Sequence, residues 1–216
     1  MALAADLYWS FRSPYSYLAI RRWRELVDRY ELEIAIRVVY PLAVRQPDFF
    51  ERQHPNWLRY TMLDVARLAQ FHGMRLSPPR PDPIVQDMAT RRIAADQPLI
   101  HRLVRLGQVA ARRGRGFAFA DQVAQLIWGG TADWHQGTHL AGAAANAGLE
   151  LADLEREAAE DATALDDEVA ANQTALEEAG HWGVPTLVFA GEPFFGQDRI
   201  ELALWRMRQA GLTERA

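Results

Sequence analysis

Hydrophobic periodicity divides the chain into a β-rich beginning, a long helical middle and a β-rich end. Residues 3–9 form an apolar run with the length of a buried strand. Residues 14–30 repeat hydrophobic side chains about every 3.6 positions, which is typical of an amphipathic helix. Residues 33–40 alternate and are rich in β-branched side chains, which favours a second strand. Two strands flanking one helix predict a βαβ unit with parallel strands.

The middle of the chain shows helical patterns interrupted by glycine and proline. Residues 57–72 are amphipathic, and the expected buried stripe consists of Leu58, Met62, Val65, Leu68 and Ala69. The proline-rich residues 77–83 predict a stiff loop. Further helical segments are expected around 84–96, 98–114, 117–128, 136–147 and 151–179.

The end of the chain returns to strands. Residues 186–190 predict a strand, 191–192 a hairpin turn and 193–195 a short partner strand. Asp198, with Glu201 three residues later, forms a capping-box-like pattern at the start of a last helix. The order of elements therefore predicts an α/β protein.

Composition removes several kinds of chemistry. A chain of 216 residues, 49% of them hydrophobic, is expected to form one compact domain or one domain with an inserted subdomain. The absence of cysteine excludes disulfide exchange, a cysteine nucleophile and zinc–thiolate sites built from the chain. All 24 basic residues are arginine, which excludes a Schiff-base lysine and a Walker A lysine. If thiol chemistry occurs here, a small molecule must bring the sulfur.

Charge and length argue against several partners. The net charge of −4 gives no reason to expect binding to nucleic acid or to an anionic membrane. No apolar run reaches the length of a membrane span, and the first residues lack the basic region of a signal peptide, so a cytoplasmic protein is expected. His135 and His139 are four residues apart, but Gly137 weakens a helix between them, and no metal site is expected.

Ser13 and Pro14 combine two helix-start signals directly after the first strand. A serine hydroxyl at the N-cap accepts a hydrogen bond from a free backbone N–H, and proline fits the first helical position. One interpretation is that Ser13 only caps the helix. The other is that its hydroxyl and the positive pole of the helix bind an anion, which we hypothesise to be the thiolate of a ligand.

Two later segments offer further ligand contacts. Val184-Pro185 is a candidate cis peptide that would expose the backbone of Val184 for pairing with an extended peptide, whereas a trans proline would only begin a strand. Gln197 and Asp198 lie at another helix start, where they either bind the carboxylate and ammonium groups of a ligand or cap the helix.

Four segments together resemble a known family. They are Tyr8-x-x-Phe11-x-Ser13-Pro14-Tyr15-Ser16-Tyr17-Leu18-Ala19, Tyr60-x-x-x-Asp64-x-x-Arg67-x-Ala69, Gly183-Val184-Pro185-Thr186 and Phe195-Gly196-Gln197-Asp198-Arg199. They are similar to the 2-hydroxychromene-2-carboxylate isomerases, which are relatives of the kappa-class glutathione transferases in the DsbA-like branch of the thioredoxin folds. The resemblance implies a thioredoxin-like domain of residues 1–42 and 181–216, a helical insertion domain of residues 43–180, and a homodimer.

The resemblance also implies a cofactor and roles for five residues. The cofactor would be glutathione, and the hydroxyl of Ser13 would hydrogen-bond its sulfur. Val184, before a cis Pro185, would pair with the glutathione backbone. Gln197 and Asp198 would hold its γ-glutamyl end.

The reaction implied by the resemblance is a glutathione-dependent cis–trans isomerisation in naphthalene breakdown. It converts 2-hydroxychromene-2-carboxylate, a small aromatic carboxylate, into trans-o-hydroxybenzylidenepyruvate. A lysine common in the family is replaced here by Trp57, so an arginine is expected to bind the substrate carboxylate. The residues expected to bind the substrate are Phe11, Arg12, Arg45, Trp57 and Arg59. The alternatives are a kappa-like transferase that conjugates electrophiles and a non-catalytic DsbA-like binding module.

Overall fold

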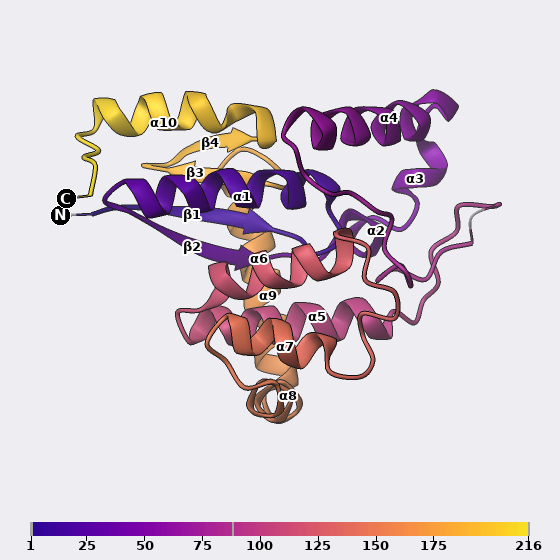
Figure 1. Ribbon diagram of the computed structural model, residues 1–216. Helices are drawn as coiled ribbons and strands as arrows, with labels where there is room; N and C mark the ends of the chain where they lie inside the picture. The colour runs from indigo at the N-terminus through magenta and orange to yellow at the C-terminus, as the bar shows by residue number, and fades with distance from the viewer. Residues whose placement is uncertain (1, 88, 216) are drawn as a thin grey trace.

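The computed structural model describes residues 2–87 and 89–215, and it begins with the expected βαβ unit (Figure 1). Strand β1 (Leu3–Trp9) and strand β2 (Leu32–Val38) are parallel, with Leu3 opposite Leu32 and Trp9 opposite Val38. Helix α1 (Pro14–Arg29) connects them. The first strand and the start of the helix lie where the sequence predicts them.

A hairpin near the C-terminus completes the sheet. Strand β3 (Thr186–Phe189) is antiparallel to β1 and pairs with strand β4 (Glu192–Phe195), so that the strand order is β2-β1-β3-β4. The two-residue turn between β3 and β4 consists of Ala190 and Gly191, both with positive φ, as a right-twisted hairpin requires. A short 3₁₀ helix, η1 (Gln197–Arg199), leads into the last helix, α10 (Ile200–Gln209).

Helices occupy most of the chain between β2 and β3. They are α2 (Leu42–Arg45), α3 (Phe49–Arg52), α4 (Pro55–Phe71), α5 (Pro98–Arg112), α6 (Gly116–Trp128), α7 (His139–Asn146), α8 (Leu151–Glu160) and α9 (Ala162–Glu178). The helices predicted from the sequence were wrong in two places here. Residues 84–87 and 89–96 form a loop with one antiparallel bridge, between Gln86 and Ile93, whereas residue 88 lies outside the described residues. The helix expected over 151–179 is divided at Asp161. The boundaries of the insertion domain stay a prediction.

Both faces of β1 are buried, which fixes the position of the sheet. Leu7 and Trp9 point into the main hydrophobic core, whereas Tyr8 between them packs with Val39 and with Leu176 of α9. Alternate residues of a strand point to opposite faces, so α9 covers one face of the sheet and the main core the other. In Figure 1, α10 lies over the hairpin on one side of α1, α5 to α8 lie below the sheet, and α9 passes behind them.

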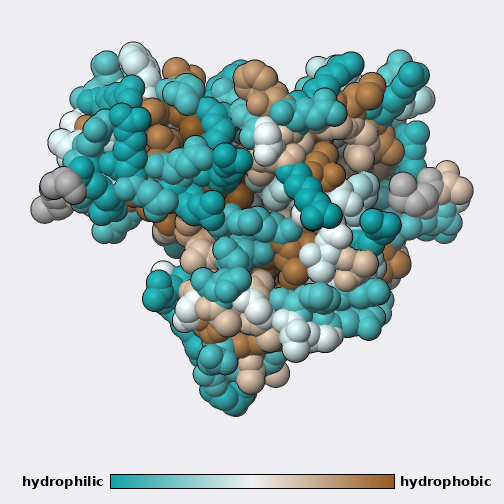
Figure 2. Space-filling model, in the orientation of Figure 1, coloured by the Kyte–Doolittle hydropathy of each residue, from teal (hydrophilic) through white to brown (hydrophobic). Residues whose placement is uncertain are grey.

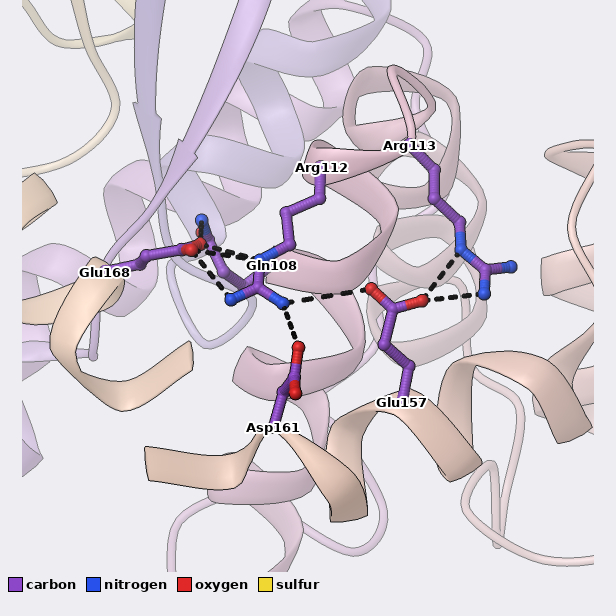
Figure 3. A network of polar contacts seen from close by, with 6 residues as sticks. All are labelled: Gln108, Arg112, Arg113, Glu157, Asp161 and Glu168. Atoms are coloured by element: carbon purple, nitrogen blue, oxygen red, sulfur yellow. Dashed lines mark hydrogen bonds and ion pairs between the residues drawn. The ribbon is translucent and has the colours of Figure 1, made fainter. Parts of the chain in front are cut away.

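Arginine–carboxylate pairs join α5 to α8 and α9 (Figure 3). Arg112 reaches Asp161 at 2.6 Å and Glu168 at 2.7 Å, and Arg113 reaches Glu157 at 2.7 Å. The Arg112 guanidinium lowers the pKa of Glu168 below its usual value. These pairs therefore join the end of α5 to carboxylates of residues 157–168 within the helical layer.

Helix α4 has few buried residues for its length. The prediction that its whole apolar stripe is buried was wrong. Val65 and Ala69 are buried, but Leu58 is 39% exposed and Met62 is 46% exposed. Phe71 at the end of the helix is 82% exposed. Figure 2 shows hydrophobic side chains at the surface in the region of α4.

Candidate functional site

Ser13 is the N-cap of α1, as the sequence predicts. Its backbone is extended, and its Oγ accepts a hydrogen bond from the backbone N–H of Ser16 at 3.2 Å. Pro14 occupies the first helical turn. Ser13 is only partly buried, so its hydroxyl combines the positive end of a 16-residue helix with access from the surface.

The loop before β3 lies directly against this hydroxyl. The Val184–Pro185 peptide bond is cis, and the Ser13 Oγ lies 3.4 Å from the Val184 carbonyl oxygen, to which it donates. The two segments are 171 residues apart in sequence. In the described part of the chain, the Val184 N–H makes no hydrogen bond. A backbone donor and a backbone acceptor are therefore presented beside the cap of α1, as pairing with an extended peptide requires.

The turn between β4 and α10 brings Gln197 and Asp198 to the same end of α1. Arg22 of α1 donates to the Gln197 carbonyl at 3.1 Å. Gln197 is 7% exposed, yet its side-chain amide has no hydrogen-bond partner among the described residues. Asp198 is exposed and pairs with Arg199 at 2.6 Å. The expected capping box does not form, because neither helix start in this segment has a side-chain cap.

Tyr15 ties α4 to the first turn of α1. Its hydroxyl donates to Asp64 at 2.8 Å. Burial raises the pKa of Tyr15 well above its usual value, the hydrogen bond to Asp64 adds to this, and the charges of Asp64 and Asp198 raise it further. Tyr15 therefore stays a protonated donor, and the Asp198 carboxylate lies close enough to act on it.

Aromatic rings from two distant segments form a wall beside the cis-proline loop. Phe49 lies 5.7 Å from Trp57 and 6.1 Å from Trp182, measured between ring centroids. Trp182 precedes Val184 by two residues and is 46% exposed. On its other side, Trp182 stacks on His181, which stacks on Phe195 at 3.9 Å. The exposed ring of Trp182 and the partly exposed rings of Phe49 and Trp57 form a surface that an aromatic ligand can contact.

Arg45 places a positive charge at this wall. Its Nε donates to the Tyr40 carbonyl at 2.8 Å and its Nη1 to the Trp182 carbonyl at 2.9 Å. Among the described residues no carboxylate forms an ion pair with it. Burial lowers the pKa of Arg45, and the charge of Glu177, which forms no ion pair with it, offsets this in part. A bound anion would supply a direct partner.

His181 stays neutral in this arrangement. The backbone N–H of Gly183 donates to its Nδ1 at 2.8 Å, so the proton of the neutral ring belongs on Nε2. Burial lowers the pKa of His181 below its usual value. The neutral ring therefore supports both the loop before Val184 and the ring of Phe195.

The other predicted substrate residues lie in different surroundings. The Phe11 side chain is 1% exposed and packs against Trp9 and Phe119, so it belongs to the core. Arg12 makes two hydrogen bonds to Asp82, at 2.6 and 2.7 Å, and is neutralised there. Arg59 is exposed on α4. Of the predicted substrate residues, the structure brings only Arg45 and Trp57 to the aromatic wall.

Sequence reasoning missed Phe49, His181 and Trp182. Each is an aromatic residue in a segment without helical or alternating periodicity, and no local pattern assigns it a position. The only available signal was the density of aromatic residues in two segments that flank the middle of the chain.

Two general findings concern other kinds of site. Within residues 2–87 and 89–215, no three side chains of the metal-ligating types lie together. No helix in that same part of the chain is both long enough and apolar enough to span a bilayer.

Comparisons with known proteins agree with this architecture. A family model described as a DSBA-like thioredoxin domain matches residues 4–207. No curated protein sequence matches the chain. A solved structure of 2-hydroxychromene-2-carboxylate isomerase is 23% identical, with a TM-score of 0.70 and 96% of each chain covered. These likenesses confirm the expected α/β thioredoxin fold of the DsbA type.

Two further solved structures carry disulfide-exchange names. A "probable DsbA oxidoreductase" from Streptomyces coelicolor is 17% identical, with a TM-score of 0.67. The match covers 96% of this chain and 89% of that protein's chain. The cytosolic disulfide reductase DsbM from Pseudomonas aeruginosa, solved with GSH, is 14% identical with a TM-score of 0.61. The match covers 96% of this chain and all of that one. At these identities the likeness concerns the fold.

Proposed function

Since the chain belongs to the DsbA-like thioredoxin domain family and contains no cysteine, we propose that it binds glutathione and uses the thiol of that cofactor for catalysis. The proposed reaction is cis–trans isomerisation of an aromatic unsaturated keto acid, of which 2-hydroxychromene-2-carboxylate is the leading candidate. The observation that carries the proposal is the contact between the Ser13 hydroxyl and the Val184 carbonyl. This contact places the Ser13 hydroxyl, at a helix N-terminus, beside the backbone of Val184. The peptide backbone of a thiol-containing ligand could pair with Val184 there.

Two groups of this chain have free hydrogen-bonding capacity that fits a glutathione tripeptide, and a third, the Ser13 hydroxyl, would exchange its long contact with the Val184 carbonyl for one with the sulfur. The Val184 N–H and the Gln197 side-chain amide lack partners among the described residues. The Ser13 hydroxyl is partly exposed at the positive end of α1. Val184 would pair with the cysteinyl backbone, and Gln197 and Asp198 would hold the γ-glutamyl carboxylate and ammonium.

The bound cofactor would supply a thiolate that adds reversibly to a conjugated double bond, which lets that bond rotate. The residues of the chain would make this possible. The positive end of α1 and the Ser13 hydroxyl stabilise negative charge at the sulfur position and so lower the pKa of the thiol there. Trp57, Trp182 and Phe49 would hold the aromatic ring and exclude water.

Arg45 is the residue that we propose binds the substrate carboxylate. Among the charged residues predicted to bind substrate, it is the one that lies at the aromatic wall, and it forms no ion pair with a carboxylate in the described part of the chain. A carboxylate is the ligand that a half-buried guanidinium prefers, because the pair forms charge-assisted hydrogen bonds. Arg12 does not fit this role, since Asp82 already occupies its guanidinium.

The experiment is an ultraviolet assay of 2-hydroxychromene-2-carboxylate isomerisation, with and without glutathione. The proposal predicts turnover only when glutathione is present, with glutathione recovered unchanged. Ser13→Ala should abolish most of the activity. Ser16→Ala is the matched control, because the Ser16 hydroxyl is buried and has no hydrogen-bond partner among the described residues.

Other outcomes would contradict the proposal. A stable thioether product and consumption of glutathione would indicate a kappa-like transferase. No glutathione binding at millimolar concentration in calorimetry would indicate a non-catalytic binding module. A homodimer and a cytoplasmic location stay predictions, and gel filtration with light scattering would test the first.

A further inference from the structure

A pocket lies away from the site described above, between α1, the turn that follows α4, and the end of α6. Its volume is about 410 Å³, within the range of small-molecule sites. Its polar lining includes Tyr17, Arg21, Arg24, Arg75, Asp121 and Gln125. Three of these are arginines and one is an acid, so the lining is unusually basic for a chain of net charge −4.

Two of the three arginines are already paired. Arg24 donates to Asp121, whose side chain is 4% exposed and also accepts from Gln125 at 2.8 Å. Arg21 pairs with Glu25 at 3.2 Å, at an exposed position. These pairs account for two positive and two negative charges, so they leave the pocket with the charge of Arg75.

Arg75 lines the pocket as an exposed side chain with its donors free. Its guanidinium makes no hydrogen bond or ion pair with another described residue. It lies against Gly130, where an added Cβ would be 3.4 Å from its Nη2 and 3.6 Å from its Nε. Gly130 has φ of +97°, a conformation that favours glycine, so the backbone there leaves room for the guanidinium.

The base of the pocket is rigid. The Tyr17 hydroxyl donates to the Arg75 carbonyl, and the Tyr17 ring stacks on Trp128 with centroids 6.5 Å apart. Burial raises the pKa of Tyr17, which keeps the hydroxyl a donor. The turn that carries Arg75 is therefore fixed to α1 through its backbone, independently of its side chain.

We propose that this pocket binds a small organic anion through Arg75, with its carboxylate or phosphate group on the guanidinium. A guanidinium matches both groups by parallel hydrogen bonds. The half-exposed Arg24, which is paired with the buried Asp121, and Gln125 supply polar contacts for the rest of the ligand. The site is separate from the residues proposed to hold glutathione, and it does not depend on that proposal.

The test is calorimetric titration of the full-length protein with inorganic phosphate and, separately, with malonate, both in buffer that contains glutathione. We expect saturable binding of at least one anion and a higher unfolding temperature in its presence. Arg75→Gln should weaken binding about 10- to 100-fold, the effect of losing a charge-assisted hydrogen bond of about 1.5–3 kcal/mol. Preference for phosphate or for malonate identifies the group that the pocket recognises.

The matched control is Arg92→Gln, which also removes one exposed arginine whose side chain has no partner among the described residues. It should leave binding unchanged. Arg75→Gln should leave the unfolding temperature of the unliganded protein unchanged, because no side-chain bond is lost. The proposal is overturned if neither anion binds saturably at millimolar concentration, or if Arg92→Gln weakens binding as much as Arg75→Gln does.

Discussion

Replacing Ser13 by alanine separates the two roles of this residue, cap and thiolate donor. The cap bond to the Ser16 N–H, at 3.2 Å, is long, so its loss should destabilise the fold by about 0.5–1 kcal/mol, the lower part of the range for such substitutions. The contact with the Val184 carbonyl is longer still, at 3.4 Å, and adds little. Stability alone would thus change only slightly.

The effect on catalysis should be much larger. A hydrogen bond to a charged sulfur is worth about 1.5–3 kcal/mol, which corresponds to a rise of about 1–2 units in the pKa of the bound thiol. Less thiolate at neutral pH and a lost donor together predict about a 10²-fold decrease in kcat/KM for Ser13→Ala.

The assay is isomerisation rate against pH, run beside urea unfolding of the same variants. Ser13→Thr keeps a hydroxyl and should retain the cap and more of the activity than Ser13→Ala. Part of the loss in Ser13→Ala should be recovered at high pH, where the thiol ionises without help. The reasoning is refuted if Ser13→Ala has the wild-type rate and pH profile, or if its rate falls only in proportion to its folded fraction.

Three further predictions follow from the same geometry. Asp198→Ala should raise the KM for glutathione about tenfold, equivalent to about 1.4 kcal/mol, with little change in unfolding temperature, since Asp198 is exposed; an unchanged KM would exclude it from binding. The folded state holds His181 below its usual pKa, so it binds fewer protons than the unfolded chain, and stability should fall as pH decreases below about 6.5. In thermal unfolding at several pH values, His181→Asn should be less sensitive to acid, and equal sensitivity would contradict this assignment. Gly107→Ala would place a Cβ 2.6 Å from the Phe11 ring, and overpacking of about 1–3 kcal/mol should exceed the gain in helix propensity of about 1 kcal/mol; a more stable variant in urea unfolding would show that the ring moves freely.

Local signals predicted the parts of the fold that depend on neighbours in sequence. The bounds of β1 and the cap of α1 follow from an apolar run, Ser13 and Pro14, all within about ten residues. The α/β class followed from periodicity, and the thioredoxin fold from the resemblance. These features need no long-range information.

The errors come from contacts between distant residues. The loop expected as a helix over 84–96 is held open by the side chain of Gln97, which accepts from the Val85 N–H and donates to the carbonyls of Val85 and Ala94. Arg12, which is predicted to bind substrate, forms an ion pair with Asp82, 70 residues later, and that partner could not be inferred from the sequence. A sequence pattern contains no information about such partners.

The prediction of which side chains are buried was also wrong in places. The period of α4 identifies an apolar stripe, but it does not say whether the stripe is covered, and Met62 is 46% exposed. Phe11 neighbours Ser13 in sequence, yet its ring follows Leu7 and Trp9 into the core, because the alternation of β1 continues past the strand. Arg45 and Trp57 were predicted to bind substrate, but their position beside Phe49 and Trp182 depends on the fold and could not be predicted from the sequence.

The central claim is that the start of α1 stabilises the thiolate of a bound glutathione beside Ser13. Ultraviolet absorbance of the thiolate, recorded as the wild-type complex is titrated with base, measures the pKa of that thiol directly. The account predicts a bound thiol that ionises at least about one unit below the pKa of about 8.5 typical of a free cysteine thiol. A bound glutathione whose thiol ionises at its free value would contradict it.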